Sequence, residues 1–379
     1  MRLLFPIFRY FPHGGLQSDM LRIAEAALRR GHEVTIATMA WQCEDAPPDG
    51  IVLKLFPARG LSNHARAKHF AAEIGAFAAA GRFDRIVGFN RLPGLDLYFA
   101  ADNCFAKSAA ARHPKWALAL LPRYRTFLAL ERAVFAPESK TRILCLTERQ
   151  KREFIEVYGT PEARFTLLPP GISPAHRRPE NAEEVRAAKR VELGVAPEET
   201  LLLEVGSGFR TKGVDRTLEA FAALPEELRR KTKLFIAGRE SSRKFESLAR
   251  RLNLAGRVTF GGGRDDVREL MLAADLLVHP ARNEAAGNVL VEAIAAGTPV
   301  FCTENCGFSG YVAESGGMVL PGPFDQAAFA AELAELLSTP GRLDAMRQQT
   351  VAYGKNADFY RRPEAAVDAI EEAAHGAIH

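Results

Sequence analysis

The sequence lacks any apolar run of roughly 18 residues, the length that a membrane-spanning helix needs. Its first residues, "MRLLFPIFRYFP", hold too short an apolar stretch for a signal peptide, and Arg9 interrupts it. Cysteine is scarce, odd in number and scattered, which favours reduced cytosolic thiols over a disulfide framework. We therefore expect a cytoplasmic protein. The five cysteines are Cys43, Cys104, Cys145, Cys302 and Cys306.

A strong excess of charge of either sign is also missing. The formal net charge is +4 in a composition that is 47% apolar and 25% charged, which is typical of a soluble globular protein and does not indicate a nucleic-acid partner. Metal-binding patterns are equally weak. Cys302 and Cys306 have no nearby His/Cys pair to complete a site, and Asp265 and Asp266 do not form an Asp-x-Asp motif.

Apolar runs of strand length alternate with amphipathic stretches of helix length, which predicts an α/β fold. A chain of 379 residues exceeds one ordinary core, so two domains are expected. Thr147 and Gln150 fit a capping box that opens a helix. The predicted strands are 2–8, 33–38, 85–89, 97–101 and 142–146 in the first half, and 200–206, 233–238, 257–262, 276–280 and 298–303 in the second.

The alternation of predicted strands and helices is interrupted near Pro169–Ile172, where two prolines and a glycine follow one another. We place domain 1 at 1–170 and domain 2 at 171–357, each a Rossmann-like doubly wound sheet, with ligands in a central cleft that both domains face. A final helix within about 358–379 packs on one of the two domains, and a return to the first is one of the two possibilities.

Two glutamates stand eight positions apart in "NEAAGNVLVEAIAAGTPVF", at Glu284 and Glu292. In one helix they would lie ~12 Å apart along the axis and ~80° apart around it, which argues against an acid–base pair of the glycosidase kind. A helix that opens at Gly287 instead offers its first amides to an anion. Two carboxylates that flank a diphosphate describe a nucleotide-sugar site. From the spacing alone, an exposed helix residue and a loop acid are the simpler interpretation.

The segment "EAAGNVLVEAIAAGTPV" resembles the E-x7-E signature of glycosyltransferase family 4, the retaining glycosyltransferases with the two-domain GT-B fold. Further stretches keep the family order through most of the chain, among them "LLLEVGSGFRTKGVDRTLEAFAAL" and "VTFGGGRDDVRELMLAADLLVHPARNEAAG". In the N-terminal half, "FRYFPHGGLQSDMLRIAEAALRRGH" and "VGFNRLPGLDLYFAADNCF" are similar to the members that add the first outer-core hexose to inner-core heptose of bacterial lipopolysaccharide.

The resemblance implies a retaining hexosyltransferase with UDP-glucose or a related UDP-hexose as donor and a lipid A–core oligosaccharide as acceptor. It implies no metal and no cofactor. Domain 1 would bind the acceptor and domain 2 the nucleotide sugar. Two alternatives stay open: a GT-B transferase for another lipid-linked or soluble acceptor, and a nucleotide-sugar epimerase.

The resemblance also implies roles for individual residues. Lys212 and Arg210 would bind the donor diphosphate and stabilise its charge, with Arg210 at a position where related sequences vary. Glu284 would hold the transferred sugar, Glu292 the ribose, and Arg264 would lie at the base. Other expected donor contacts are Gly14, Gly15, Gly206, Ala285, Ala286, Gly287, Asn288 and Val289.

Four residues of domain 1 are further candidates. Asp19 would contact the donor sugar or the acceptor hydroxyl, although an ordinary acid in the first turn of a helix explains it too. Asp102 follows a strand and points towards the predicted cleft. Asn63 and His64 would line the acceptor side, and a plain surface loop is an equal alternative.

Residues 107–135 combine six Lys/Arg and one acid with interleaved leucine and aromatic residues. This composition is typical of an interfacial segment on an anionic membrane, and it also fits an amphipathic helix packed on its own domain. The first interpretation predicts peripheral association with the cytoplasmic face of the inner membrane.

Overall fold

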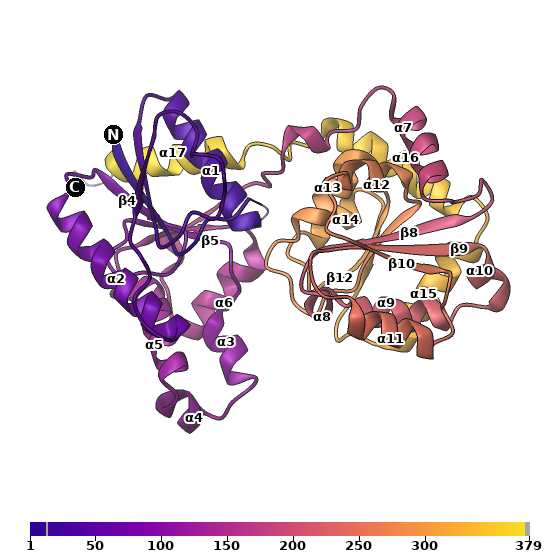
Figure 1. Cartoon of the computed structure of the whole chain (residues 1–379), viewed down its shortest axis with the longest axis horizontal. Helices are drawn as coiled ribbons and strands as arrows, with labels where there is room; N and C mark the ends of the chain where they lie inside the picture. Colours follow the sequence, from indigo (N-terminus) through magenta and orange to yellow (C-terminus); the bar gives the residue numbers. More distant parts are fainter. Residues whose placement is uncertain (13, 376–379) are drawn as a thin grey trace. The chain divides into compact units, whose positions relative to one another are not determined.

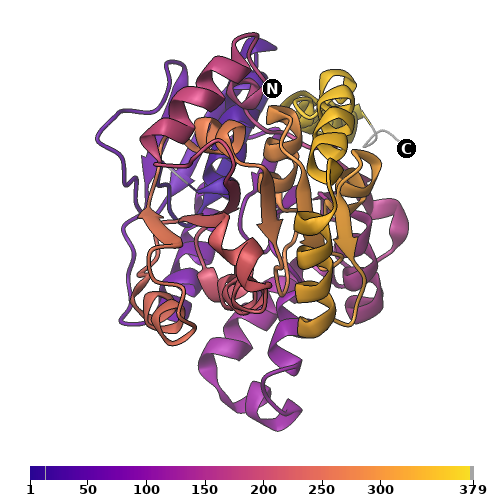
Figure 2. The ribbon, with the colours of Figure 1, turned by 90° about the vertical axis from the view of Figure 1, so that its right-hand side faces the viewer.

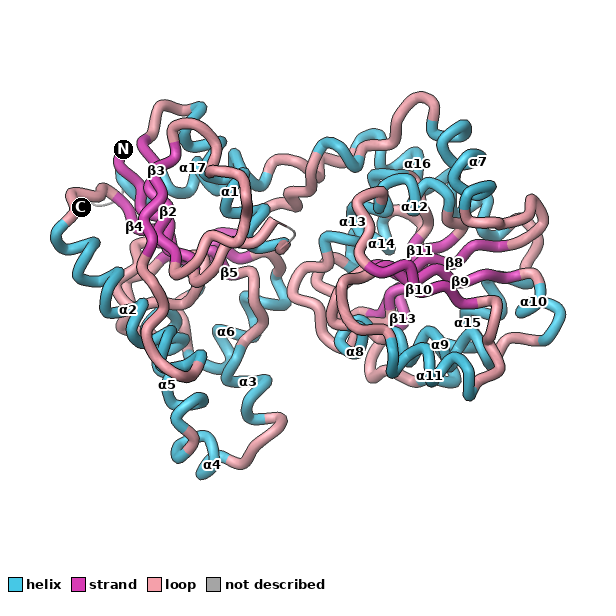
Figure 3. Tube along the Cα trace, viewed as in Figure 1, coloured by secondary structure: helices cyan, strands magenta, loops and turns pink. Residues whose placement is uncertain are grey.

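The computed structural model describes residues 1–12 and 14–375, and the end of the segment 358–379 therefore lies outside the described residues. The chain divides into two compact units, unit 1 with Met1–Gly171 and Arg361–His379 and unit 2 with Ile172–Tyr360. Each unit has a parallel sheet with helices packed against it (Figures 1 and 3). Each of the two units is thus a Rossmann-like α/β layer structure.

Unit 1 contains a seven-stranded parallel sheet in the order β3-β2-β1-β4-β5-β6-β7. Its interior strands are nearly continuous apolar runs, as expected where helices cover both faces. Tyr98 and Phe135 belong to one of its buried clusters. The strands are β1 (Arg2–Ile7), β2 (Glu33–Thr38), β3 (Ile51–Leu55), β4 (Arg85–Gly88), β5 (Leu97–Ala100), β6 (Arg142–Cys145) and β7 (Phe165–Leu167).

The helices of unit 1 include the last one of the chain, α17, which packs beside α1 (Figure 1). Arg30, the residue directly after α1, donates to Asp368 at 2.7 Å and to Glu371 at 2.9 Å. The final segment thus returns to the first unit. The helices are α1 (Gly15–Arg29), α2 (Asn63–Ala80), α3 (Phe105–Ala110), α4 (Lys115–Leu120), α5 (Pro122–Phe135), α6 (Glu148–Tyr158) and α17 (Arg362–His375), with a 3-10 turn η1 (Glu162–Arg164).

The start of α6 contains the hydroxyl-to-amide bond of the predicted capping box. The Thr147 hydroxyl accepts a hydrogen bond from the Gln150 amide at 3.2 Å. The Gln150 side chain donates instead to the carbonyls of Ala100 and Asp102, at 2.7 and 2.9 Å. It therefore fixes the loop after β5 to the start of α6.

Residues 105–135, here called the arm, project from unit 1 as three helices (Figures 1 and 2). Within the arm, the Phe105 ring packs on Tyr124 and on Phe127, each with ring centroids 5.8 Å apart. Trp116 and Leu120 near its tip are 68% and 69% exposed. The arm is thus packed internally and has an apolar tip in contact with solvent.

Unit 2 contains a six-stranded parallel sheet in the order β10-β9-β8-β11-β12-β13. The strands are β8 (Thr200–Val205), β9 (Thr232–Ala237), β10 (Val258–Gly262), β11 (Leu276–His279), β12 (Val300–Thr303) and β13 (Met318–Leu320). The helices are α7 (Ala182–Glu192), α8 (Phe209–Lys212), α9 (Val214–Ala222), α10 (Glu226–Arg230), α11 (Arg243–Arg251), α12 (Val267–Ala273), α13 (Asn288–Ala296), α14 (Ser309–Glu314), α15 (Gln326–Ser338) and α16 (Arg342–Asn356), with a 3-10 turn η2 (Pro174–His176).

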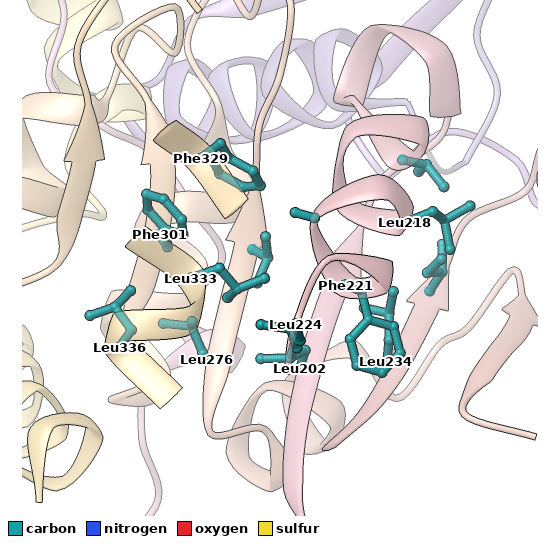
Figure 4. Close-up of a cluster of buried hydrophobic side chains, with 14 of the residues drawn as sticks. Leu202, Leu218, Phe221, Leu224, Leu234, Leu276, Phe301, Phe329, Leu333 and Leu336 are labelled. Carbon is teal, nitrogen blue, oxygen red and sulfur yellow. The ribbon is translucent and has the colours of Figure 1, made fainter. Parts of the chain in front are cut away.

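A buried apolar cluster joins this sheet to α9 and α15 (Figure 4). Phe301 of β12 stacks on Phe329 of α15 with ring centroids 4.5 Å apart. Leu218 and Phe221 of α9 are fully buried in the same cluster. This packing fixes α9, and with it the loop between β8 and α9 that carries candidate site residues.

Candidate functional site

The loop after β8 is shaped around the Lys212 side chain. Gly206 has a φ of +143°, and a Cβ there would lie 3.0 Å from the Lys212 Cε. Gly213 follows with a φ of +91°, and a Cβ there would meet the Pro280 carbonyl oxygen at 2.2 Å. Only glycine tolerates both the backbone conformation and this close approach. The loop therefore holds Lys212 at the carboxyl end of the sheet of unit 2.

Lys212 forms an ion pair with Glu284, 72 positions further along the chain. The His279 ring, fully buried at the end of β11, lies 3.6 Å from the same carboxylate. Burial raises the pKa of Glu284, but His279 and the Lys212 charge outweigh it and lower the pKa to about 2. Glu284 is therefore ionised at neutral pH and can accept hydrogen bonds from sugar hydroxyls.

The backbone around Glu284 is held by a second segment. The Glu284 amide donates to the Asn305 carbonyl at 3.0 Å, and the Glu284 carbonyl accepts from the Gly307 amide at 3.2 Å. The Phe308 amide donates to the Ala286 carbonyl at 2.7 Å. This backbone pairing positions the loop that the sequence assigns to the transferred sugar.

Arg282 braces the two loops against each other. Its guanidinium binds both oxygens of Asp215 at 2.8 and 2.7 Å, and it also donates to the Arg210 carbonyl at 2.6 Å. Its backbone amide donates to the Thr211 carbonyl at 2.8 Å. Such a planar two-bond pair fixes orientation as well as charge. The Arg210 side chain itself is exposed.

The helix α13 begins at Asn288 after Gly287, whose φ is +91°. Val289 lies in the first turn, where backbone amides face out of the helix end and attract anions. Glu292, one turn further, lies 3.9 Å from the His176 ring. The preceding Ala285 and Ala286 are small, so a ligand can approach the backbone closely.

Arg264 lies in the loop between β10 and α12. Its guanidinium binds Asp266 through Nε at 2.7 Å, and Lys189 reaches the same carboxylate at 2.8 Å. The Arg264 hydrogen bond, working against burial, holds the pKa of Asp266 well below its usual range. This network keeps the "GGGRDD" loop fixed to α7.

Asp19 lies in unit 1, in the helix α1, which begins at Gly15 with Gly14 as its N-cap. Its side chain is 4% exposed and both carboxylate oxygens are engaged. Oδ1 accepts from Arg22 at 2.6 Å and Oδ2 from Arg362 at 2.9 Å. These contacts give Asp19 a role in anchoring α17 that the sequence did not reveal.

The acceptor candidates of unit 1 line separate hollows. Asp102 is exposed at a cavity of about 270 Å³ that also contains Asn90 and Arg123. Asn63 lies at a cavity of about 300 Å³ with Arg9 and Arg66. His64 belongs to a wider hollow of about 570 Å³ and lies 3.1 Å from the Ser62 hydroxyl. The first two hollows share Phe8, Asn90 and Phe127.

Three residues close to Lys212, Arg282 and Glu284 were not identified as site residues from the sequence. His279 was visible only as a histidine at the end of a predicted strand, and Asp215 as an acid in a predicted helix. Glu204 gave no signal beyond its place at the end of the run "LLLE". Its side chain is buried, and neither carboxyl oxygen has a hydrogen-bond partner among the described residues.

Over residues 1–12 and 14–375, no cluster of three or more His, Cys, Asp or Glu side chains has a metal-binding arrangement. No helix in the same ranges is both long and apolar enough to cross a membrane. Two Rossmann-like units, with a glycine-rich lysine loop and an acidic residue before a helix start in the second, are the arrangement expected of a GT-B glycosyltransferase.

Comparison with known proteins assigns the family. Residues 13–176 match the family described as Glycosyltransferase Family 4, and residues 185–357 match Glycosyl transferases group 1. The chain belongs to glycosyltransferase family 4. It is 42% identical to the lipopolysaccharide glucosyltransferase WaaG of Escherichia coli K12 over 371 residues, 98% of each chain.

Other relatives extend this result. The D-inositol 3-phosphate glycosyltransferase of Nocardia farcinica is 27% identical and aligns with 96% of this chain and 86% of its own length. A crystal structure of WaaG, a glycosyltransferase involved in lipopolysaccharide biosynthesis, superimposes with a TM-score of 0.90 at 41% identity, covering 97% of this chain and 99% of that one. Anabaena HepE in complex with UDP and glucose has a TM-score of 0.75 at 18% identity, covering 98% and 100%, which shows the shared fold.

Proposed function

We propose that the protein transfers glucose, or a related hexose, from its UDP conjugate to inner-core heptose of lipopolysaccharide with retention of configuration. The observation that carries the proposal is the similarity to a lipopolysaccharide glucosyltransferase over 98% of the chain, because it includes the N-terminal unit as well as the donor unit. The resemblance assigns the acceptor to the N-terminal domain, so similarity that extends through unit 1 supports a similar acceptor.

Unit 2 holds the donor in this proposal. Lys212 and Arg210 bind the diphosphate, together with the backbone of Gly206 and the helix start at residues 285–289. Glu284 accepts hydrogen bonds from the transferred sugar and Glu292 from the ribose. The pairing of Lys212 with Glu284 supports this arrangement, because it places an ammonium and a hydroxyl acceptor side by side. Arg264 contributes at the base, and Gly14 and Gly15 meet the diphosphate from unit 1.

The reaction needs no covalent intermediate with the protein. The bond between the anomeric carbon and the diphosphate oxygen breaks, and a bond to the acceptor oxygen forms on the same face of the sugar. The acceptor proton passes to the leaving phosphate. Lys212 stabilises the negative charge that develops on that phosphate, and the remaining contacts supply orientation.

Unit 1 supplies the acceptor side through Asn63, His64, Asp102 and, in contact with the donor sugar or the acceptor hydroxyl, Asp19. The hollows at Asn63 and Asp102 support this assignment, since they share the aromatic residues Phe8 and Phe127 and each is also lined by arginines. An oligosaccharide presents both apolar ring faces and polar groups, so such a lining suits it.

We infer that the tip of the arm, residues 112–125, rests on the anionic cytoplasmic face of the inner membrane. The single acid of the arm, Glu131, is fully buried and accepts hydrogen bonds from the Phe105 and Ala106 amides, both at 2.8 Å. Arg112, Arg123 and Arg125 are exposed. The solvent-facing part of the tip therefore carries positive charge next to exposed apolar side chains.

The membrane proposal is tested by sedimentation with anionic vesicles. Trp116→Ser should weaken binding, while Val191→Ser on α7, which is 80% exposed, is the matched control. Binding should also fall with salt. Equal binding by the tip variant and the control would contradict the proposal.

Acceptor-dependent release of UDP tests the function. The purified protein is incubated with UDP-glucose, with and without lipid A–core acceptor, and the experiment is repeated with chelator. Release that requires the acceptor supports transfer. Conversion of the sugar without acceptor would favour the epimerase alternative, and release only with a different acceptor would favour another GT-B transferase.

A further inference from the structure

The carboxyl group of Glu204 is buried close to the loop between β8 and α9, which carries Lys212. The proposed mechanism does not use this group. Glu204 of β8 is 1% exposed, and both of its carboxyl oxygens lack a hydrogen-bond partner among the described residues. Thr217 of α9 is also fully buried and its hydroxyl has no such partner either. An ionised carboxylate without a partner is strongly disfavoured in such a place, so the group takes up a proton instead.

Glu204 lies just before the loop between β8 and α9, to which the proposed function assigns the donor diphosphate. Side chains alternate along a strand, so Glu204 shares a face with Leu202, which packs in the cluster that contains Val214 and Leu218 of α9. Two residues later the chain reaches Gly206, which lies against the Lys212 side chain. Glu204 is thus enclosed between the sheet and the start of α9, on the side where Lys212 lies.

The two charged groups near Glu204 shift its pKa in opposite directions. Burial raises its pKa to about 8, and the smaller influence of the Thr217 hydroxyl and the Lys212 charge opposes the shift. Asp215 raises the pKa further, although Arg282 pairs with Asp215. Lys212 and Asp215 are the charged groups of the described residues that act on this carboxyl. Its neutral form is therefore the dominant one at pH 7.

We propose that Glu204 is a positioning residue whose neutral form adds no second anion near Lys212, so that loss of its proton sets an alkaline limit to donor binding. This inference rests on the proposed function, because it takes Lys212 as a ligand of the diphosphate. Once ionised, Glu204 would compete with the phosphates for Lys212 and repel them. A unit charge about 10 Å away in a partly buried site changes affinity roughly tenfold at an effective dielectric near 20.

The test is calorimetric titration with UDP at pH 7.5 and pH 9.5, since terminal phosphates with a second pKa of about 6 have already ionised at the lower value. The dissociation constant of the wild-type protein should rise roughly tenfold between the two pH values. Glu204→Gln, a neutral replacement of nearly the same shape, should abolish most of this rise. Glu219→Gln is the matched control, because Glu219 is an exposed acid on α9, the helix that also contains Thr217.

Two results would overturn the inference. One is an equal alkaline rise in Glu204→Gln and the wild type, and the other is loss of UDP binding by a folded Glu204→Gln protein at pH 7.5. If that variant does not fold, infrared spectra of the wild type decide, since a protonated carboxyl band must be present at pH 7 and vanish as the pH rises. Absence of UDP binding at both pH values would instead overturn the proposed function.

Discussion

The charge cluster between α1 and α17 permits a sharp test of what Asp19 does. Arg362 is fully buried, donates to Asp19 at 2.9 Å through Nη1, and donates to the Pro169 carbonyl at 3.1 Å through Nε. A Cβ at Gly171 would lie 2.2 Å from the Arg362 Cβ, so the guanidinium stem is closely packed. This arginine cannot turn to solvent without moving the segment on which it lies.

Asp19→Asn keeps the shape of the side chain but removes the carboxylate charge that pairs with the buried Arg362 guanidinium. Breaking a buried ion pair in this way costs ~3–5 kcal/mol. Unit 1 has about 190 residues, and in domains of this size ~1 kcal/mol corresponds to ~2–4 °C in Tm. We therefore expect the transition of unit 1 to fall by at least ~6 °C, a lower bound from the same figures.

Differential scanning calorimetry measures the shift, and Glu25→Gln on the same helix is the control because no ion pair of Glu25 is present among the described residues. Turnover is measured well below the lowered Tm. If anchoring is the main role, kcat/KM stays within about tenfold of the wild type. An unchanged Tm together with a loss of ~100-fold or more in turnover would refute this reasoning and favour contact with the sugar or the acceptor.

Four further outcomes are expected. Lys212→Ala should lower kcat by at least ~100-fold without a comparable loss of Tm, the scale of one strong contact to a developing anion, and near-normal turnover would contradict its assignment. Glu284→Ala should weaken UDP-glucose binding far more than UDP binding, and equal loss in calorimetry would argue against a sugar contact. Because the folded pKa of Glu284 is about 2, below its unfolded value, its contribution to stability is present above about pH 4.3 and is lost as the pH falls towards 2, so Glu284→Gln should flatten the acid limb of Tm against pH. Gly213→Ala should destabilise unit 2 by more than Gly194→Ala, because both have a positive φ but only the former meets a neighbour within 4 Å, and similar losses would show that the contact with Pro280 relaxes.

The interior of both sheets could be predicted from the sequence, whereas three of the four sheet edges could not. Strands β5 and β11 are buried at every position and read as continuous apolar runs. The missed strands β3, β7 and β13 are all at edges and are only partly buried. An edge strand has one pairing neighbour and a less covered surface, so its sequence carries less of the apolar signal on which the prediction depends.

In the candidate site too, residues that belong to local motifs could be predicted from the sequence, but the contacts between distant residues could not. Lys212 and Glu284 are recognisable because each belongs to a local motif, but their contact joins positions 72 apart and has no local signal. The same holds for Arg282 and Asp215, which meet across 67 positions. Pairings of this kind follow from the order of strands in the sheet, and spacing along one segment does not contain that information.

These pairings change how charge at the donor site is understood. Lys212 is balanced by Glu284 and Arg282 by Asp215, so each of the two loops contributes one cation and one anion that already face each other. A diphosphate must therefore compete with Glu284 for Lys212, or share it. Arg210 is exposed and forms no ion pair among the described residues, and the first turn of α13 adds the partial positive charge of a helix end. Arg210, which the sequence placed at a variable position, thus carries more of the proposed attraction for the donor than its motif alone suggests.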